Sequence, residues 1–461
     1  MQRIPVLLFL MLLIAAAFSR CAQIVAPTGG PKDTLPPVLV AIDPPDSSLH
    51  FNSKKITLGF DEFVQLQNLQ QELIVTPYPK RQPTITSKLR TVTIQIKDTL
   101  QPNTTYTINL GSAVQDINEN NPLKNLRYVF STGDYLDSLQ ISGTLYDAET
   151  GDTDSSALIM LYTNLEDSVV TKEKPLYYAR SAAGGKFHIG NLPHGRFKLF
   201  ALKDANGDLQ YDDSTEAIAF ISDSLQLDSN LDNVDLRLFT EKVAAPPIDS
   251  SELKDTLTFK TSLSSGKQDL HQPLVLQFSR RLQAFDSSKI TLEEDTARSV
   301  VHPVFSLDST RKQLSLTYKW KEETPYRLLL QPDFATDTGG LKIPKADTLS
   351  FTTKGASDYG TLILHFTQYD SAQHVVVELV QNDKVVSSLP LQGKTWKIEN
   401  LTPGDYSVRL LLDRNGNGKW DGGQYYGEKR LPEIVVPIEQ KFNVRANWDN
   451  DIQPALEWKM P

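Results

Sequence analysis

Two polar loops have the residue types and the spacing of a calcium-binding loop. Each begins with an Asp directly after an apolar segment, at Asp204 and at Asp413. Oxygen atoms at loop positions 1, 3, 5, 7, 9 and 12 can surround a calcium ion, with position 7 using its backbone carbonyl. In loop order, the oxygen-bearing residues are Asp204, Asn206, Asp208, Gln210 and Asp212 in the first loop and Asp413, Asn415, Asn417, Lys419 and Asp421 in the second. The sequence thus predicts bound calcium and indicates no other cofactor.

Both loops depart from the calcium pattern at particular positions. The twelfth residue is Thr215 or Gln424 where a bidentate Glu is usual, although Glu216 is adjacent in the first loop. The sixth residue is Gly418 in the second loop but Leu209 in the first. Asp, Asn and Gly also build tight turns without metal, and that alternative stays open. With two full carboxylates, the second loop is expected to bind calcium weakly, with a dissociation constant of about 10⁻⁴–10⁻³ M.

The rest of the sequence contains none of the common enzyme motifs. The seven histidines are scattered, and H-E-x-x-H, G-x-S-x-G and the Gly-rich phosphate-binding patterns do not occur. Neighbouring acidic residues such as Asp61 and Glu62, or Glu293 and Glu294, are expected to be solvated surface groups. The stretch from Asp116 is expected to be a plain turn. We therefore predict that the protein is not an enzyme.

Composition limits the class of protein. A chain of 461 residues argues for several domains, at about 100–200 residues each. Its 39% hydrophobic residues exclude a uniformly disordered chain. A net charge of -9 without any basic block argues against nucleic acid as a partner. The single cysteine excludes a disulfide framework and a multi-cysteine metal cluster.

The N-terminus resembles an export signal. An apolar run over residues 6–17 follows Arg3, and the only cysteine, Cys21, comes shortly after it. We predict a lipoprotein signal over residues 1–20 with acyl chains on Cys21. An ordinary secretory signal is the alternative, because Arg20 fits a lipoprotein cleavage site poorly. A Pro- and Gly-rich tether is expected to extend to residue 37.

The mature chain repeats itself in an A-B-A′-B′ order. Residues 191–204 and 400–413 each contain an Asn-Leu turn, an apolar strand and the Asp that opens a polar loop. Residues 56–62 resemble 274–280, and residues 128–132 resemble 349–353. Short strands with period-two alternation, separated by turn residues, predict an all-β protein of tandem β-sandwiches.

The repeat sets the expected domain boundaries. We expect sandwiches over residues 38–133, 134–240, 257–354 and 355–461, with a Pro- and Ala-containing linker over 241–256. The linker predicts two separable halves.

The first unit of the repeat resembles the bacterial Ig-like domain of the SbsA type. The resemblance rests on residues 33–37 (DTLPP), 58–62 (LGFDE), 100–106 (LQPNTTY) and 128–132 (YVFST). The third unit lacks the opening proline signature. The resemblance implies Ig-like sandwiches for the A units.

The B units resemble prealbumin-like sandwiches of the carboxypeptidase-regulatory and Cna-B kind. Residues 141–145 (ISGTL) and 185–189 (GKFHI), with the Asn-Leu turns, carry this similarity. With Cys21 followed by residues 27–33 (PTGGPKD), the whole chain resembles Ig-like lipoproteins of the Bacteroidota. That resemblance implies a lipid anchor in the outer membrane and leaves open which face carries the protein.

Asp-Ser and Asp-Thr triplets resemble the O-glycosylation sequon of exported Bacteroidota proteins. Chance in an Asp- and Ser-rich surface is the alternative. The residues that would be modified are Thr34, Thr99, Ser138, Ser168, Ser214, Ser224, Thr256, Thr296, Ser309, Thr348 and Ser371.

Three functions remain in competition. The first is a non-enzymatic, membrane-anchored binding or scaffolding protein, with outer-membrane proteins or envelope glycans as partners. The second is an accessory subunit of a machine that assembles or transports outer-membrane β-barrel proteins. The third is a glycan-binding or glycan-active protein, for which Trp420, Tyr425 and Tyr426 offer sugar-stacking surfaces.

Overall fold

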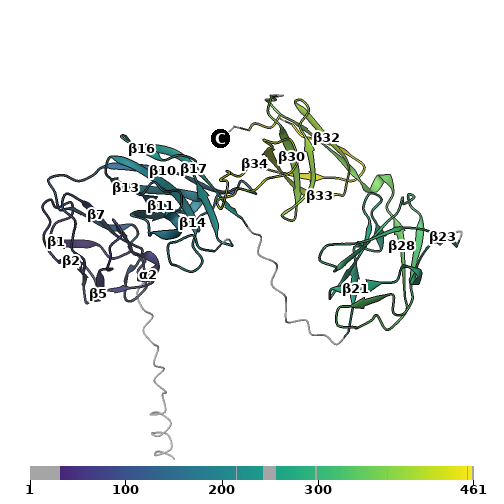
Figure 1. The fold of residues 1–461 in the computed structure, drawn as a ribbon, viewed down its shortest axis with the longest axis horizontal. Coiled ribbons are helices and arrows are strands. Elements are labelled where there is room, and N and C mark those ends of the chain that lie inside the picture. The colour runs from purple at the N-terminus through teal and green to yellow at the C-terminus, as the bar shows by residue number, and fades with distance from the viewer. Residues whose placement is uncertain are drawn as a thin grey trace, which may run out of the picture. The chain divides into compact units, whose positions relative to one another are not determined.

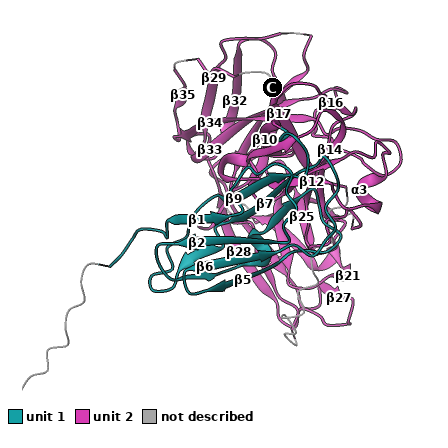
Figure 2. Cartoon of the chain, turned by 90° about the vertical axis from the view of Figure 1, so that its left-hand side faces the viewer, with its two compact units in different colours: residues 1–137 teal, residues 138–461 magenta. Residues whose placement is uncertain are grey.

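The computed structural model describes residues 32–213, 215–241, 256–295, 298–370, 372–453 and 455–458. These residues form an almost all-β protein of tandem sandwiches (Figure 1), which confirms the predicted fold class. They divide into two compact units, Met1–Asp137 and Ser138–Pro461, coloured separately in Figure 2. The predicted signal peptide, Cys21 and most of the linker lie outside the described residues. Within the described residues, no helix is long and apolar enough to cross a membrane.

The first compact unit holds one sandwich. Its sheets have the strand orders β1-β2-β6-β5, β4-β7-β9 and β3-β8. Alternation places Val92 and Ile94 of β6 on the buried face, opposite Leu58 and Ile56 of β2. The elements are β1 (Leu39–Asp43), β2 (Lys55–Phe60), β3 (Val64–Leu66), α2 (Leu69–Glu72), β4 (Ile74–Thr76), β5 (Thr84–Lys88), β6 (Thr91–Gln95), β7 (Thr105–Gly111), β8 (Val114–Asp116) and β9 (Leu126–Ser131).

The second sandwich opens the second compact unit. Its strands follow the order β12-β11-β14-β15-β17-β10-β13, with β16 also paired to β14, and β10 runs parallel to β17. The elements are β10 (Leu139–Asp147), β11 (Leu158–Tyr162), α3 (Val169–Lys172), β12 (Tyr177–Arg180), η1 (Ala183–Gly185), β13 (Lys186–Leu192), β14 (Gly195–Lys203), β15 (Ala217–Phe220), β16 (Leu225–Leu227) and β17 (Leu231–Thr240).

The third sandwich resembles the first in its pairing. Leu274 and Leu276 of β20 lie opposite Leu316 and Leu314 of β25. Strands β2 and β6 of the first sandwich pair in the same antiparallel way. The sheet orders are β18-β20-β25-β24, β19-β28-β26-β22-β23 and β21-β27. The elements are β18 (Phe259–Thr261), β19 (Lys267–Gln268), β20 (Leu274–Phe278), β21 (Leu282–Phe285), η2 (Ser287–Lys289), β22 (Ile290–Glu294), β23 (Ser299–Val301), β24 (Val304–Leu307), β25 (Gln313–Thr317), β26 (Pro325–Leu330), β27 (Ala335–Asp337) and β28 (Asp347–Thr353).

The fourth sandwich consists of two sheets, with the orders β32-β29-β35 and β31-β30-β33-β34. Its first strand pairs in parallel with its last, as β10 does with β17 in the second sandwich. The elements are η3 (Ala356–Asp358), β29 (Gly360–His365), β30 (Val375–Gln381), β31 (Lys384–Pro390), β32 (Thr395–Leu401), β33 (Gly404–Leu412), β34 (Ile434–Val444) and β35 (Asp449–Asp451).

The turns before β14 and β33 share an unusual backbone conformation. Asn191 and Asn400 have φ values of 56° and 59°, and Gly195 and Gly404 begin the two strands at φ values of 157° and 150°. Asn and Gly accept positive φ more readily than other residues. The repeated Asn-x-x-x-Gly spacing therefore reflects one repeated turn, and an Asp-led loop follows each of these strands.

Candidate functional site

The first Asp-led loop is organised around the Asp204 carboxylate. Its Oδ1 accepts a hydrogen bond from the backbone N–H of Gly207 at 2.7 Å, and its Oδ2 accepts from Leu209 at 2.9 Å. Leu209 has a positive φ of 63° at the position where a calcium loop usually has Gly. The loop thus makes the predicted sharp turn despite the Leu.

The next acidic side chains of this loop converge on one amide. Asn206 Nδ2 donates to Asp208 Oδ2 at 3.1 Å and to Asp212 Oδ1 at 3.3 Å. The backbone N–H of Gln210 in turn donates to Asp208 Oδ1 at 2.8 Å. The structure therefore brings the predicted third, fifth and ninth positions together.

The Glu216 carboxylate connects the end of the first loop to its beginning. Its side chain is only 3% exposed, and its Oε1 accepts from the backbone N–H of Ala205 at 3.0 Å. Its Oε2 is buried without a hydrogen-bond partner among the described residues. Burial raises the pKa of Glu216 above its usual value, and the nearby charges of Asp204, Asp212 and Asp208 raise it further.

The second Asp-led loop repeats this plan. Asp413 is 4% exposed, and its carboxylate accepts backbone hydrogen bonds from Gly416 and Gly418 at 2.7 Å each. Asn415 and Asn417 both donate through Nδ2 to Asp421 Oδ2, at 2.7 and 2.6 Å. Lys419 follows, and its backbone N–H donates to Asn417 Oδ1 at 2.7 Å.

Glu433 is the closing carboxylate that sequence reasoning missed. It is 4% exposed and accepts from the backbone N–H groups of Arg414, at 2.7 Å, and Asp421, at 3.1 Å. It has the same role as Glu216 but follows its leading Asp at a greater distance along the chain. The equivalence is seen only in the structure, where each closing carboxylate accepts from the backbone N–H of the residue after the leading Asp, Ala205 or Arg414.

The two loops differ in how fully their closing carboxylates are satisfied. Both oxygens of Glu433 accept hydrogen bonds, whereas one oxygen of Glu216 has none. In the described part of the chain, no group of three or more His, Cys, Asp and Glu side chains already has the arrangement of a metal site. Calcium binding at the second loop stays a prediction. The loop itself has the geometry of a turn closed by backbone hydrogen bonds.

The segment after the second loop packs against the second sandwich. Tyr425 is 4% exposed, and its ring meets those of Phe200, Tyr211 and Phe220 edge-on, with centroids 6.1, 5.4 and 5.7 Å away. Tyr426 stacks on Tyr211 at 5.3 Å. Edge-on aromatic pairs of this kind contribute beyond their buried area. The fourth sandwich is therefore docked on the second through an aromatic anchor.

Charged groups surround this anchor. Glu241 accepts from the backbone N–H groups of Tyr425 and Tyr426 and from the Tyr211 hydroxyl. Lys429 lies with Nζ 4.3 Å from the centre of the Tyr425 ring and 3.4 Å from Asp167 Oδ1. The Tyr425 hydroxyl donates to the Asp167 carbonyl. The hydroxyl and backbone N–H of Tyr425 and the backbone N–H of Tyr426 thus have partners in the second sandwich.

The docked surfaces are in close contact. A Cβ atom added to Gly423 would lie 2.5 Å from ring carbons of Phe239 in β17. A Cβ atom added to Gly151 would lie 2.4 Å from the carbonyl oxygen of Val435 in β34. Both distances are too short for a side chain, so these two glycines allow the sandwiches to approach.

The aromatic residues proposed for sugar stacking have another role. Tyr425 is buried in the docking contact, and the Trp420 indole N–H donates to the Glu433 carbonyl at 3.1 Å. Tyr426 stays 43% exposed, and the most exposed aromatic side chain among the described residues of this sandwich is Trp448, 62% exposed beside a polar hollow of about 360 Å³. The hollow is also lined by Glu399, Asn400, Asn447 and Asp449.

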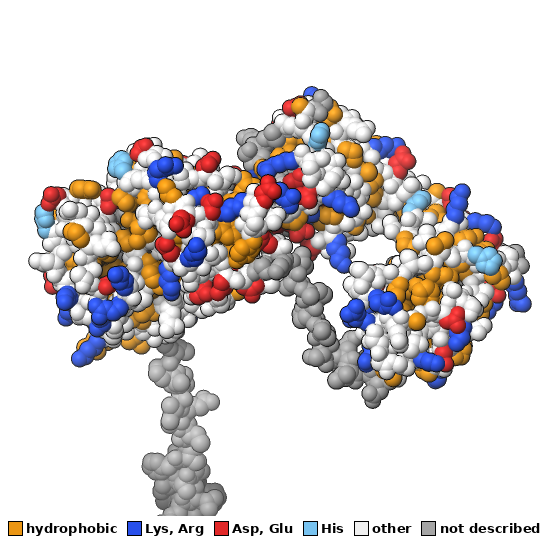
Figure 3. Space-filling model, viewed as in Figure 1, with side chains coloured by type: hydrophobic (Ala, Val, Ile, Leu, Met, Phe, Trp, Pro, Cys, Tyr) orange, Lys and Arg blue, Asp and Glu red, His pale blue; other side chains and the backbone are white. Residues whose placement is uncertain are grey.

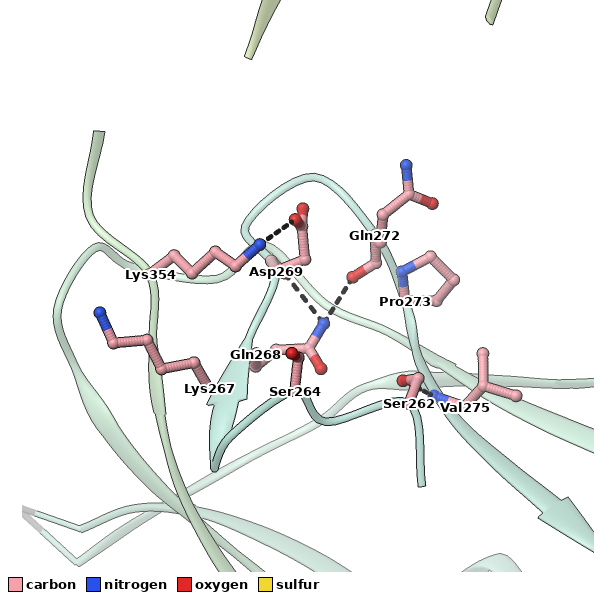
Figure 4. Close-up of a pocket in the computed structure, with 9 residues that line it drawn as sticks. All are labelled: Ser262, Ser264, Lys267, Gln268, Asp269, Gln272, Pro273, Val275 and Lys354. Carbon is pink, nitrogen blue, oxygen red and sulfur yellow. Dashed lines mark hydrogen bonds and ion pairs between the residues drawn. The ribbon is translucent and has the colours of Figure 1, made fainter. Parts of the chain in front are cut away.

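A second cavity, of about 340 Å³, lies in the third sandwich (Figure 4). Lys354 is paired there with Asp269 at 3.1 Å, and Gln268 Nε2 donates to the carbonyls of Asp269 and Gln272. The Ser262 hydroxyl accepts from the backbone N–H of Val275 at 2.9 Å. These side chains are thus held by hydrogen bonds and an ion pair within the third sandwich.

The predicted glycosylation residues are spread over the sandwiches. Ser214, Thr296 and Ser371 lie outside the described residues. Ser168 and Ser224 are half-buried. The exposed ones are Thr34, Thr99, Ser138, Thr256, Ser309 and Thr348.

Acidic and basic side chains are interspersed on the face shown in Figure 3. Asp116 ends β8, and the predicted turn follows it. The Asp116 carboxylate accepts from the backbone N–H groups of Glu119, Asn120 and Asn121 at 2.6–3.0 Å. These hydrogen bonds outweigh the effect of burial, which would raise the pKa of Asp116, and hold it below its usual value.

Comparison with known proteins identifies the first sandwich. Residues 33–132 match the bacterial Ig-like domain family Big_5. No curated protein matches the chain. Among solved structures, the N-terminal part of the bacterial S-layer protein SbsC is 12% identical, with a TM-score of 0.20 over 40% of this chain and 44% of that one. This chain thus covers less than half of the SbsC fragment.

Two further structures are similar over more of the chain. The major pilin subunit BcpA of Bacillus cereus is 10% identical over 70% of this chain and 99% of that one, with a TM-score of 0.17. The Bacillus anthracis TIE protein is 12% identical over 93% and 75%, with a TM-score of 0.16. Scores this low do not show a shared arrangement of domains. The chain is a β-sandwich protein whose first sandwich is similar to bacterial Ig-like domains.

Proposed function

We propose that this chain is a non-enzymatic scaffolding or binding lipoprotein, anchored in the outer membrane of a bacterial envelope by acyl chains on Cys21. The docking of the fourth sandwich on the second carries the proposal. Tyr425 and its partners Phe200, Tyr211 and Phe220 bury aromatic surface between the two sandwiches. Domains joined only by flexible linkers would not make such contacts. A scaffold needs such fixed domain contacts, because binding surfaces on different sandwiches must keep a constant spacing.

The anchor itself is proposed from the sequence pattern around Cys21. Lipidation of this residue would hold an otherwise water-exposed body at the membrane, since each buried methylene contributes about 0.8 kcal/mol. Surface Ser and Thr residues in Asp-led triplets would carry O-linked glycans, beginning with the exposed Thr34, Thr99 and Thr348. The partners would be outer-membrane proteins of the same envelope.

One experiment separates this proposal from its alternatives. Wild type and Cys21→Ala are labelled with an alkyne fatty acid, fractionated, and purified in mild detergent with associated proteins. We expect label and membrane partitioning in the wild type alone. A stoichiometric β-barrel partner would support an accessory role in outer-membrane assembly or transport. Labelled Cys21→Ala that still partitions with membranes would contradict the lipoprotein proposal.

Glycan binding is a second candidate because of the hollow beside Trp448. An exposed indole face next to the carboxamide and carboxylate groups of Asn447 and Asp449 offers both stacking and hydrogen bonding to a sugar. A glycan array with wild type and Trp448→Ala tests it. Loss of specific binding in the variant would support this function, and an array without signal for the wild type would contradict it.

A further inference from the structure

We infer that the first Asp-led loop, through Asp204, Asn206, Asp208, Gln210 and Asp212, is a calcium-binding site closed by Glu216. The ligand class is a hard divalent cation bound by carboxylate and carbonyl oxygens. Calcium in this loop would also order Tyr211, the residue on which the fourth sandwich docks.

The unpartnered oxygen of Glu216 is the first support. The side chain is 3% exposed and its Oε1 is bound to the Ala205 N–H, inside the turn of the loop. Oε2 has no hydrogen-bond donor among the described residues. A buried carboxylate oxygen without a donor costs free energy unless a proton or a bound cation neutralises it. A cation bound by the loop beside Glu216 would supply this neutralisation.

The charge of the loop is the second support. Asp204, Asp208, Asp212 and Glu216 place four carboxylates along one loop, although the structure does not group them as in a formed metal site. Among the described residues, no ion pair joins any of the four to a Lys or Arg. The nearest basic residue in sequence, Lys203, is paired elsewhere, with Asp154 at 3.3 Å. Four like charges held together repel one another, so the folded loop gains from a bound cation.

The arrangement favours calcium over magnesium. Asn206 and Asp212 approach each other from positions 3 and 9, and Glu216 supplies the distal carboxylate that the sequence lacks at position 12. Six to eight oxygens from a flexible loop suit calcium, whereas magnesium requires near-octahedral geometry and keeps several waters. The side chains would turn their oxygens toward the ion, since Asn206 at present directs its amide nitrogen to Asp208 and Asp212.

The loop is directly connected to the docking contact. Tyr211 lies between the Asp208 and Asp212 positions and is fully buried. Its backbone N–H donates to the Val170 carbonyl, and its hydroxyl donates to Glu241 Oε2 at 3.1 Å. Its ring contacts Tyr425 at 5.4 Å. A cation bound by the residues on both sides of Tyr211 would hold its ring in the position that contacts Tyr425.

Terbium luminescence and calcium titration of the purified full chain test the site. Tyr211 adjoins Asp212, so excitation of tyrosine should sensitise a terbium ion bound in the loop. We expect saturable luminescence that calcium displaces, at least tenfold weaker calcium binding in Glu216→Gln, and wild-type binding in the exposed control Glu149→Gln. Absence of saturable binding in the wild type would overturn the inference. Binding lost in Asp413→Asn but retained in Glu216→Gln would also overturn it.

Thermal unfolding separates a ligand from a structural carboxylate. In chelator, Glu216→Gln removes one of four crowded charges and keeps the acceptor for Ala205, so its midpoint should equal or exceed that of the wild type. Added calcium should raise the midpoint of the wild type and leave Glu216→Gln unchanged. An equal loss of midpoint in Glu216→Gln with and without calcium would show that Glu216 is only structural and overturn the inference.

Discussion

The ammonium of Lys429 lies 3.4 Å from the carboxylate of Asp167, although the two residues are 262 positions apart in the chain. Asp167 also accepts from Lys198 at 2.8 Å within its own sandwich. Lys429 in turn lies over the rings of Tyr425 and Phe220. This pair therefore joins the second and fourth sandwiches at the rim of the aromatic anchor.

Acidification should weaken the docking through Asp167. The hydrogen bond from Lys198 and the charge of Lys429 hold the pKa of Asp167 below its usual value. Lys198 belongs to the same sandwich as Asp167, so only the part of this lowering that comes from Lys429 depends on docking. That part stabilises the docked state above the ordinary pKa and is lost as the pH falls through the lowered value. The loss therefore begins below about pH 4. Because the Asp167 side chain is 63% exposed, we expect no more than about 1 kcal/mol.

The measurement is the thermal midpoint of the second compact unit between pH 7 and pH 3. Asp167→Asn should reduce the acid dependence, and the exposed control Asp223→Asn should leave it unchanged. An identical pH profile for wild type and Asp167→Asn would show that the pair does not contribute.

Removal of the Tyr425 ring should destabilise the docked state strongly. Tyr425→Ala leaves a cavity lined by Phe200, Tyr211 and Phe220 and removes the hydroxyl bound to Asp167. Large-to-small changes of buried aromatic residues cost about 3–5 kcal/mol. Denaturant unfolding of the full chain measures the effect, with the 63% exposed Tyr135→Ala as the matched control. Equal midpoints for the two variants would contradict a buried anchor.

A single added methyl group should separate the sandwiches. Gly423→Ala places its Cβ about 2.5 Å from the Phe239 ring, and overpacking of this kind costs about 1–3 kcal/mol. Gly422→Ala is the control in the same segment, since its Cβ would lie at an ordinary 3.5 Å from Trp420. Small-angle scattering should show expansion for Gly423→Ala alone. Expansion of both variants, or of neither, would not agree with the contact.

Much of the fold was predictable because strand pairing follows local patterns. The alternation of Val92 and Ile94 gives the buried face of β6, and the repeated Asn-x-x-x-Gly spacing gives the turns before β14 and β33. Asp204 and Asp413 open their loops as predicted, since a short carboxylate that accepts backbone N–H groups is a local interaction.

The contacts that were not predicted are long-range. Glu433 accepts hydrogen bonds from the second loop but follows it after an intervening segment. No fixed spacing in the sequence therefore predicts this contact. From the sequence alone, Tyr425 is expected to be an aromatic residue in a loop. Its partners Phe200 and Phe220 belong to a domain on the other side of the linker. Periodicity describes which face of a strand is buried and carries no information about which domain covers a loop.

The most direct test of the account is whether the two halves of the chain stay together after the linker is cut. A site-specific protease sequence is placed within residues 244–255, and the cleaved protein is analysed by size-exclusion chromatography with light scattering. Contacts of Tyr425, Lys429 and Glu241 across the two sandwiches predict that the wild-type fragments elute as one complex and that Tyr425→Ala releases them. Wild-type fragments that separate on cleavage at micromolar concentration would contradict a docked scaffold.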